Sequence, residues 1–191
     1  MEIALLGTFG LRVGGQAVDG LAEGSQRLLV FLALRDRPVD RVAIAGAMWP
    51  QVTEQKSRAS LRSALSRLDT TTHQAIMETS AGMSLAGSVA VDFRDSQALA
   101  KRLLRPDSPP AESDLGPVAL AALSDELLPD WYDEWVLTEA EDWRQLRLNA
   151  LEAMARLLTA GGRLPGAAGA ARAAMKVEPL RESAHASLIR V

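Results

Sequence analysis

The sequence contains no cysteine among its 191 residues. Disulfides, iron–sulfur clusters and thiolate zinc sites are therefore excluded. The absence also fits a reducing compartment, so we expect a cytoplasmic protein. No basic segment followed by an apolar stretch opens the chain, which argues against a signal peptide. The longest apolar run, residues 28–34, is far shorter than the roughly 20 residues that span a membrane, and we expect no membrane partner.

Catalytic signatures are also missing. The two histidines, His73 and His185, lie far apart in the sequence and neither belongs to a known motif. There is no G-x-S-x-G, no H-E-x-x-H, no G-x-G-x-x-G and no P-loop. Asp130, Asp133 and Glu134 form an acidic group without a histidine, and acids before a helix ordinarily serve its dipole. We therefore expect no enzyme activity, no cofactor and no metal site.

Positive charge is scarce and concentrated in one segment. The chain has 21 Lys and Arg against 24 Asp and Glu, for a formal net charge of −3. Such a chain cannot attract nucleic acid over its whole surface, so a nucleic-acid partner would have to meet a local basic patch. Residues 56–67 form such a patch in the sequence, because they include four cations and no acid.

The first half of the chain predicts strands, then three helices, then a hairpin. Residues 3–13 alternate as one strand, and Gly14-Gly15 predict a tight turn into a second strand. Ser25 is the expected N-cap of a helix that is apolar nearly all round and therefore buried. Asp40 and Thr53 are the expected caps of the next two helices.

The segment after the third helix predicts a polar break and then a hairpin. Residues 69–74 are polar, and residues 75–79 and 83–87 form two extended pieces around Ser80-Ala81-Gly82. The second and third helices are joined by only a few residues around Pro50. Two helices in that relation, followed by a hairpin, are the outline of a winged helix-turn-helix.

The third predicted helix, which runs to about residue 68, has two different faces. Leu61, Ala64, Leu65 and Leu68 share one face on a helical wheel and should pack inward. The opposite face is small and cationic, which suits insertion into a major groove, where Arg can pair with guanine and flanking cations can meet phosphates. An ordinary solvated face is the alternative interpretation. The outer residues are Lys56, Ala59, Arg62, Ser63 and Ser66, with Ser60 and Arg67 beside them.

The second half of the chain predicts helices throughout. Helices are expected over 94–105, 137–160 and 164–177, and residues 105–117 are rich in Pro, Ser and acids, as in a linker. A last helix begins near residue 180 and is still running where the sequence stops, so we expect the domain to continue beyond Val191.

One stretch of this half, residues 151–179, has the spacing of a tetratricopeptide unit. Helical pairs of this type form concave surfaces that bind partner proteins, and a pure scaffold is the alternative. Small residues and a proline fall at the positions where the paired helices must approach closely, namely Ala155, Gly162, Ala167, Ala174 and Pro179.

Several stretches resemble the winged-helix domain of the SARP-type transcriptional regulators, which is similar to the OmpR/PhoB type. They are AGAMWP (45–50), ASLRSALSRL (59–68) and VAVD (89–92). Residues 127–158 and 177–191 resemble the bacterial transcriptional activator domain that follows it in that family. The resemblance implies a mainly α fold with small antiparallel β structure. It also implies a winged helix-turn-helix over 1–93 and a helical, TPR-like activator domain over 94–191.

The resemblance also implies a function. SARP-type regulators activate biosynthetic gene clusters, antibiotic clusters among them, by binding direct-repeat operators and contacting RNA polymerase. Double-stranded DNA and RNA polymerase are therefore the implied partners, and a homodimer on DNA is compatible with repeated sites. By analogy with the family's recognition helix, the DNA-binding residues are Lys56, Arg58, Ala59, Arg62, Ser63, Ser66 and Arg67.

One departure from the family keeps a second interpretation open. The predicted hairpin, residues 75–87, contains no Lys or Arg, whereas wings in this family often present a basic residue to the minor groove. In this second interpretation, the chain is a helical-repeat adaptor protein whose winged-helix half no longer binds DNA. The acid-free third helix argues against that alternative.

Overall fold

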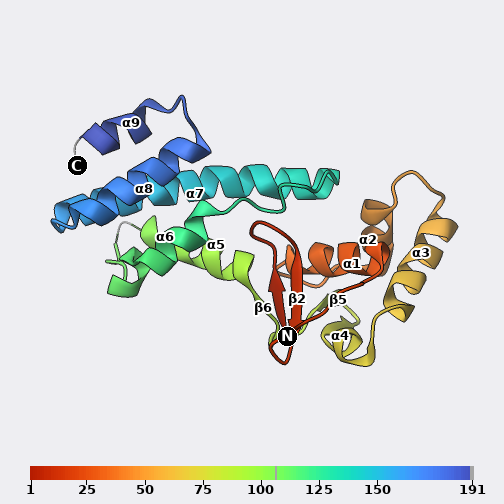
Figure 1. The fold of residues 1–191 in the computed structure, drawn as a ribbon. Helices are drawn as coiled ribbons and strands as arrows, with labels where there is room; N and C mark the ends of the chain where they lie inside the picture. The colour runs from red at the N-terminus through yellow and green to blue at the C-terminus, as the bar shows by residue number, and fades with distance from the viewer. Residues whose placement is uncertain (106, 190–191) are drawn as a thin grey trace. The chain divides into compact units, whose positions relative to one another are not determined.

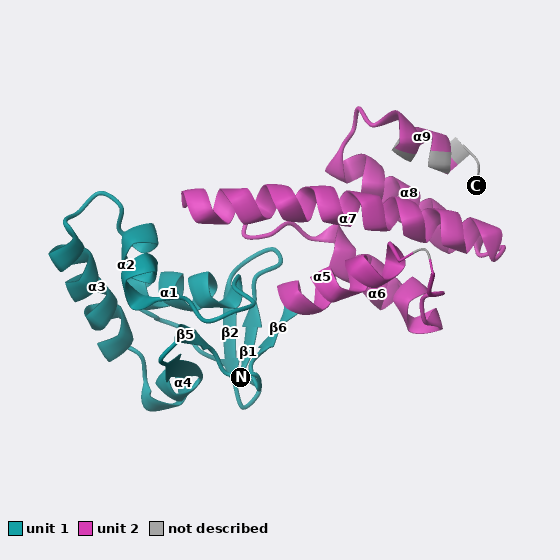
Figure 2. Cartoon of the chain, turned by 180° about the vertical axis from the view of Figure 1, so that it is seen from behind, with its two compact units in different colours: residues 1–92 teal, residues 93–191 magenta. Residues whose placement is uncertain are grey.

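The computed structural model describes residues 1–105 and 107–189. Tertiary contacts divide the chain into two compact units, Met1–Asp92 and Phe93–Val191, which Figure 2 shows in different colours. The first unit contains all the strands, and the second is helical. The predicted fold class, mainly α with small antiparallel β structure, is confirmed.

The first unit contains two small sheets and four helices (Figure 1). One sheet has the strand order β3-β2-β1-β6, in which β1 and β6 are parallel and the other pairs antiparallel, and β4 and β5 form a separate hairpin. The elements are β1 (Glu2–Ala4), β2 (Gly10–Val13), β3 (Gln16–Ala17), α1 (Glu23–Ala33), α2 (Arg41–Met48), α3 (Glu54–Ser66), α4 (Thr70–Gln74), β4 (Ile76–Thr79), β5 (Gly82–Leu85) and β6 (Ala90–Val91).

The single strand predicted over residues 3–13 was wrong, because the chain reverses within it. Gly7 has φ +78°, in the left-handed region that glycine adopts without strain, and β1 then pairs antiparallel with β2. Ile3 lies opposite Leu11, and both are buried, so the apolar alternation continues on one face across the turn. The Gly14-Gly15 hairpin turn is confirmed, with φ of 57° and 81° as a type I′ turn requires.

Helix α1 forms the core of this unit. Every residue from Leu28 to Leu34 is buried, as the apolar pattern predicted. The prediction of Ser25 as its N-cap was wrong: the helix begins at Glu23 after Ala22, and Ser25 is buried inside it. The Ser25 hydroxyl instead donates a hydrogen bond of 2.7 Å to the carbonyl of Ala64 in the last turn of α3. The Ser25 hydroxyl thus joins two helices instead of capping the start of one.

The caps of the next helices follow the sequence pattern in part. Asp40 caps α2 as predicted, because its carboxylate accepts hydrogen bonds from the backbone N–H groups of Val42 and Ala43. Thr53 occupies the N-cap position of α3 but makes no side-chain capping bond.

The polar break predicted over residues 69–74 was wrong, because these residues form helix α4. Asp69 caps it, accepting hydrogen bonds from the backbone of Thr71 and from both the backbone and the hydroxyl of Thr72. The hydrogen bond from the Thr72 hydroxyl contributes most to lowering the pKa of the Asp69 carboxyl. A short polar run can thus form a helix when one carboxylate satisfies its first N–H groups.

The second unit is built round the pairing of two long helices, α7 and α8, which lie side by side in Figure 1. The small residues predicted at their contact are buried: Ala155, Ala167 and Ala174 are each at most 1% exposed. Gly162, with φ +70°, lies in the turn between them. The elements are α5 (Asp92–Leu103), the 3₁₀ helix η1 (Glu112–Leu115), α6 (Pro117–Ser124), α7 (Glu134–Ala160), α8 (Leu164–Val177) and α9 (Glu182–Ile189).

The linker-like segment 105–117 is attached to the second unit rather than separating domains. Asp114, in η1, is 7% exposed and accepts two hydrogen bonds from the Arg102 guanidinium of α5, at 3.0 Å from Nε and 2.8 Å from Nη2. These hydrogen bonds from Arg102 lower the pKa of the Asp114 carboxyl below its usual value of 3.8. Composition alone suggested a linker, because the partner of Asp114 lies 12 residues away.

We expect Asp114→Asn to lower the free energy of unfolding by about 1–2 kcal/mol at pH 7, since a bidentate charged contact is lost and half-exposed Arg102 is partly screened by water. Because the folded pKa of Asp114 is depressed, its contribution is present above about pH 4 and is lost as pH falls through the folded value. The difference between wild type and variant should therefore shrink in acid.

Urea titrations at several pH values, followed by tryptophan fluorescence, measure this difference, because three of the four tryptophans lie in the second unit. Asp107→Asn, which removes an exposed carboxylate from the same segment, is the matched control. A deficit for Asp114→Asn that stays constant down to pH 3 would contradict the assignment.

Candidate nucleic-acid interface

Helix α3 has a buried side and an accessible side, as its sequence predicted. Ser57, Leu61, Ala64 and Leu65 are buried. Ser63 is half-buried and is the least exposed of the seven predicted DNA-binding residues. The structure therefore places all seven away from the core, and the six exposed ones are Lys56, Arg58, Ala59, Arg62, Ser66 and Arg67.

Helices α2 and α3 are held to α1 by polar contacts as well as by packing. The Ser25–Ala64 hydrogen bond joins α1 to the last turn of α3, where backbone carbonyls lack intrahelical partners. Arg27 of α1 donates a 2.7 Å hydrogen bond to the carbonyl of Met48 at the end of α2, and its guanidinium lies 6.0 Å from the ring centroid of Trp49. The helix-turn-helix is thus fixed at both of its helices.

Ion pairs divide the cations of this face into two groups. Arg58 pairs with Glu54 one turn earlier in α3, at 2.5 Å. Lys56, Arg62 and Arg67 form no ion pair within the part of the chain that the structure describes. Three cations of α3 are therefore available to an anionic partner without displacing a carboxylate.

Arg41 is a cation of this region that the sequence analysis missed. It is the first residue of α2, and its guanidinium forms a 2.8 Å ion pair with Glu78 of β4. A cavity of about 280 Å³ between α2 and α3 is lined by Arg41, Val42, Arg58, Leu61 and Arg62. The sequence contained one signal for Arg41: it directly follows the Asp40 cap and so begins the first helix of the helix-turn-helix.

The hairpin β4–β5 is docked against the residue that precedes the Asp40 cap. Val39 and Met83 exchange two backbone hydrogen bonds, of 2.9 and 2.8 Å. Gly82 has φ +123°, and a Cβ at that position would lie 2.3 Å from the carbonyl oxygen of Val39. The close approach therefore requires glycine and fixes the hairpin beside α2.

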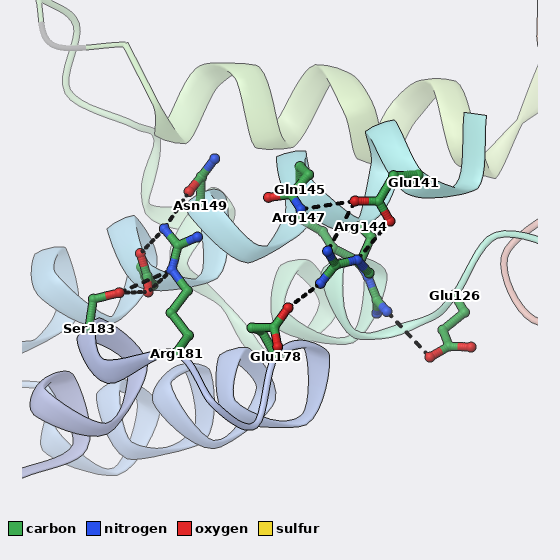
Figure 3. A network of polar contacts seen from close by, with 10 residues as sticks. Glu126, Glu141, Arg144, Gln145, Arg147, Asn149, Glu178, Arg181 and Ser183 are labelled. Atoms are coloured by element: carbon green, nitrogen blue, oxygen red, sulfur yellow. Dashed lines mark hydrogen bonds and ion pairs between the residues drawn. The ribbon is translucent and has the colours of Figure 1, made fainter. Parts of the chain in front are cut away.

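A network of arginines and acids joins the helices of the second unit (Figure 3). Arg181 donates to the buried carboxylate of Glu152 and to Asn149 of α7, which connects the start of α9 to α7. Arg144 of α7 contacts Glu141 and Glu178, and its hydrogen bonds lower the pKa of Glu141 to about 2. These contacts have a structural role, because each acid faces a guanidinium.

Arg147 of α7 is the most buried cation of this network, at 4% exposure. It donates a 2.7 Å hydrogen bond to the carbonyl of Ser124 at the end of α6 and lies 3.5 Å from Glu126. Burial has the largest influence on the pKa of Arg147 and lowers it. Arg147 thus caps α6.

A family model described as "Bacterial transcriptional activator domain" matches residues 90–191, just over half of the chain. The chain belongs to the bacterial transcriptional activator domain family. The matched residues include the helical unit, and with it the α7–α8 pair and its arginine network. The resemblance to SARP-type regulators drawn from the sequence is confirmed by this match, and the structural likeness that follows shows the fold.

A solved structure of Mycobacterium tuberculosis EmbR, in complex with a low-affinity phosphopeptide, has a similar fold. The TM-score is 0.69 at 22% sequence identity, over 98% of this chain and 53% of the EmbR chain. The chain thus spans about half the length of that structure. No curated protein matches the chain.

Two further observations apply to the part of the chain that the structure describes. None of its helices is both long enough and apolar enough to cross a membrane. No group of three or more His, Asp or Glu side chains in it is arranged to hold a metal ion.

We expect Gly82→Ala to destabilise the hairpin of the first unit by at least about 2 kcal/mol, because the added Cβ meets the Val39 carbonyl and φ is unfavourable. Hydrogen exchange measures this locally: the Val39 and Met83 amides should exchange faster. Gly87→Ala is the control, since nothing lies within 4 Å of its Cβ and its φ is not positive. Unchanged exchange at both amides in Gly82→Ala would show that the hairpin is not held by this contact.

Proposed function

We propose that this protein is a sequence-specific DNA-binding transcriptional regulator that acts as an activator. Residues 1–93 are the DNA-binding domain, and residues 94–191 are the activator domain. The observation that carries the proposal is the accessible face of α3, where Lys56, Arg62 and Arg67 have no carboxylate partner among the described residues. A regulator of this kind works in the cytoplasm, where bacterial DNA lies.

The distribution of side chains on α3 suits the two kinds of contact that DNA recognition needs. Ala59, Ser63 and Ser66 are small and let the helix approach the base edges, while Arg62, near its middle, can pair with guanine O6 and N7. Lys56 and Arg67, towards the ends, are placed for phosphates. The two cations placed for phosphates correspond to a log–log salt slope of about −2, at roughly 0.9 per phosphate.

Tight binding then needs more than one copy of the domain. So few phosphate contacts give weak affinity, and we therefore propose two protomers on direct-repeat half-sites about one helical turn apart. The family resemblance supports RNA polymerase as the second partner, reached through the activator domain. The likeness to the EmbR structure covers 98% of this chain and therefore includes residues of both proposed domains.

A helical-repeat adaptor protein without DNA binding is the second candidate. The observation that favours it is the charge of the hairpin. Glu78 forms an ion pair with Arg41, and no Lys or Arg is present over residues 75–87. In that case the α7–α8 surface binds a partner protein and α3 is an ordinary solvated face. Binding of duplex DNA separates the two candidates directly.

Substitution of Arg62 and Lys56 tests the proposed roles on a duplex selected from random sequence by the wild-type protein. We expect Arg62→Ala to cost about 1–3 kcal/mol on the selected duplex and much less on a scrambled one, as for a lost guanine contact. Lys56→Ala should weaken both duplexes alike and reduce the magnitude of the salt slope by about one.

Both residues are exposed, so the melting temperature of each variant should match that of the wild type. Equal weakening of selected and scrambled duplexes by Arg62→Ala would make Arg62 a phosphate contact. If the wild-type protein selects no sequence and binds no duplex, the adaptor candidate replaces the proposal.

A further inference from the structure

Three arginines converge on the cavity between α2 and α3. Arg41 belongs to α2, Arg58 and Arg62 belong to α3, and only Val42 and Leu61 complete the lining. Guanidinium groups that share one cavity repel each other unless anions lie between them. Two carboxylates supply that compensation, because Glu78 pairs with Arg41 and Glu54 with Arg58.

Another anion can displace either of these two carboxylates from its arginine. The side chains of Arg41 and Glu78 are 47% and 43% exposed, and those of Arg58 and Glu54 are 50% and 66% exposed. Ion pairs so exposed are weak, whereas a phosphate offers oxygens that match the fork of a guanidinium. The first N–H groups of α2 cannot be the anchor, because the Asp40 cap already occupies those of Val42 and Ala43.

We propose that Arg41 and Arg58, which line this cavity, bind one phosphate group of the DNA backbone while Arg62 stays available to a base edge, and that Glu78 competes with the phosphate for Arg41. The inference rests on the proposed function and deepens it. Glu78 comes from the hairpin, 37 residues along the chain from Arg41. The hairpin therefore lowers DNA affinity through its acid, where a basic wing would raise it.

Glu78→Gln tests the competition, because it removes the charge and keeps the size of the side chain. We expect it to tighten binding of selected and scrambled duplexes alike by about three- to tenfold at low salt, and to increase the magnitude of the salt slope by about one. The gain should disappear when Arg41→Gln is also present, since Arg41 then has no charge for either anion. This double-mutant cycle isolates the Arg41–Glu78 pair.

Glu2→Gln is the matched control, because it removes an exposed acid of β1 in the same unit. A gain from Glu78→Gln that persists in the Arg41→Gln background, or that Glu2→Gln reproduces, is a general charge effect and overturns the inference. An unchanged affinity in Glu78→Gln overturns it as well.

Titration with inorganic phosphate, followed by NMR of the arginine Nε–Hε signals, separates this inference from the proposed function. A saturable shift of the Arg41 signal that is stronger in Glu78→Gln, together with the duplex results above, supports the phosphate site. A shift without any binding of duplex DNA shows a site for free phosphate and overturns both the backbone contact and the proposed function. Absence of a shift while wild type binds duplex overturns the site alone.

Discussion

Burial of helix α1 is the constraint on which the first unit depends. The seven residues from Leu28 to Leu34 are all buried, and α2, α3 and β5 pack round this helix. Apolar burial of this kind is the dominant favourable contribution to folding. Because α3 presents Leu61 and Leu65 to the core, its cations are left on the opposite side, and the Ser25–Ala64 hydrogen bond fixes that orientation. The chemistry of the face thus follows from the packing of the core.

The electrostatics of the first unit reconcile an acidic chain with the DNA-binding role that we propose for α3. A formal charge of −3 provides no general attraction for DNA, so the local pattern has to supply it. Glu54 and Glu78 each form an ion pair with one arginine. Among the described residues, no carboxylate pairs with Lys56, Arg62 or Arg67. In the function that we propose, one domain binds weakly, and occupancy of DNA depends on repeated sites where two copies act together.

Local patterns in the sequence predicted most of the elements, although the turn at Gly7 and the short helix α4 were missed, and long-range contacts account for the side-chain partners that were misassigned or missed. The Asp40 cap, the hairpin round residues 80–82 and the small residues between α7 and α8 each follow from neighbours in the sequence. Ser25 was misassigned because its partner, Ala64, is 39 residues away. The Arg41–Glu78 and Arg102–Asp114 contacts were missed for the same reason: neither charge pattern specifies its partner. The outward placement of the seven α3 residues was predictable, and their binding to DNA stays a prediction.

Photo-crosslinking from one position on α3 tests the central claim most directly, and the absence of native cysteine makes it possible. Ala59→Cys places a benzophenone label on the exposed face of α3, and Ala121→Cys places the same label on an exposed residue of α6. The account predicts covalent adducts with the selected duplex from position 59, suppressed by unlabelled duplex, and none from position 121. Equal adducts from both positions, or none from position 59 while the duplex is bound, would contradict it.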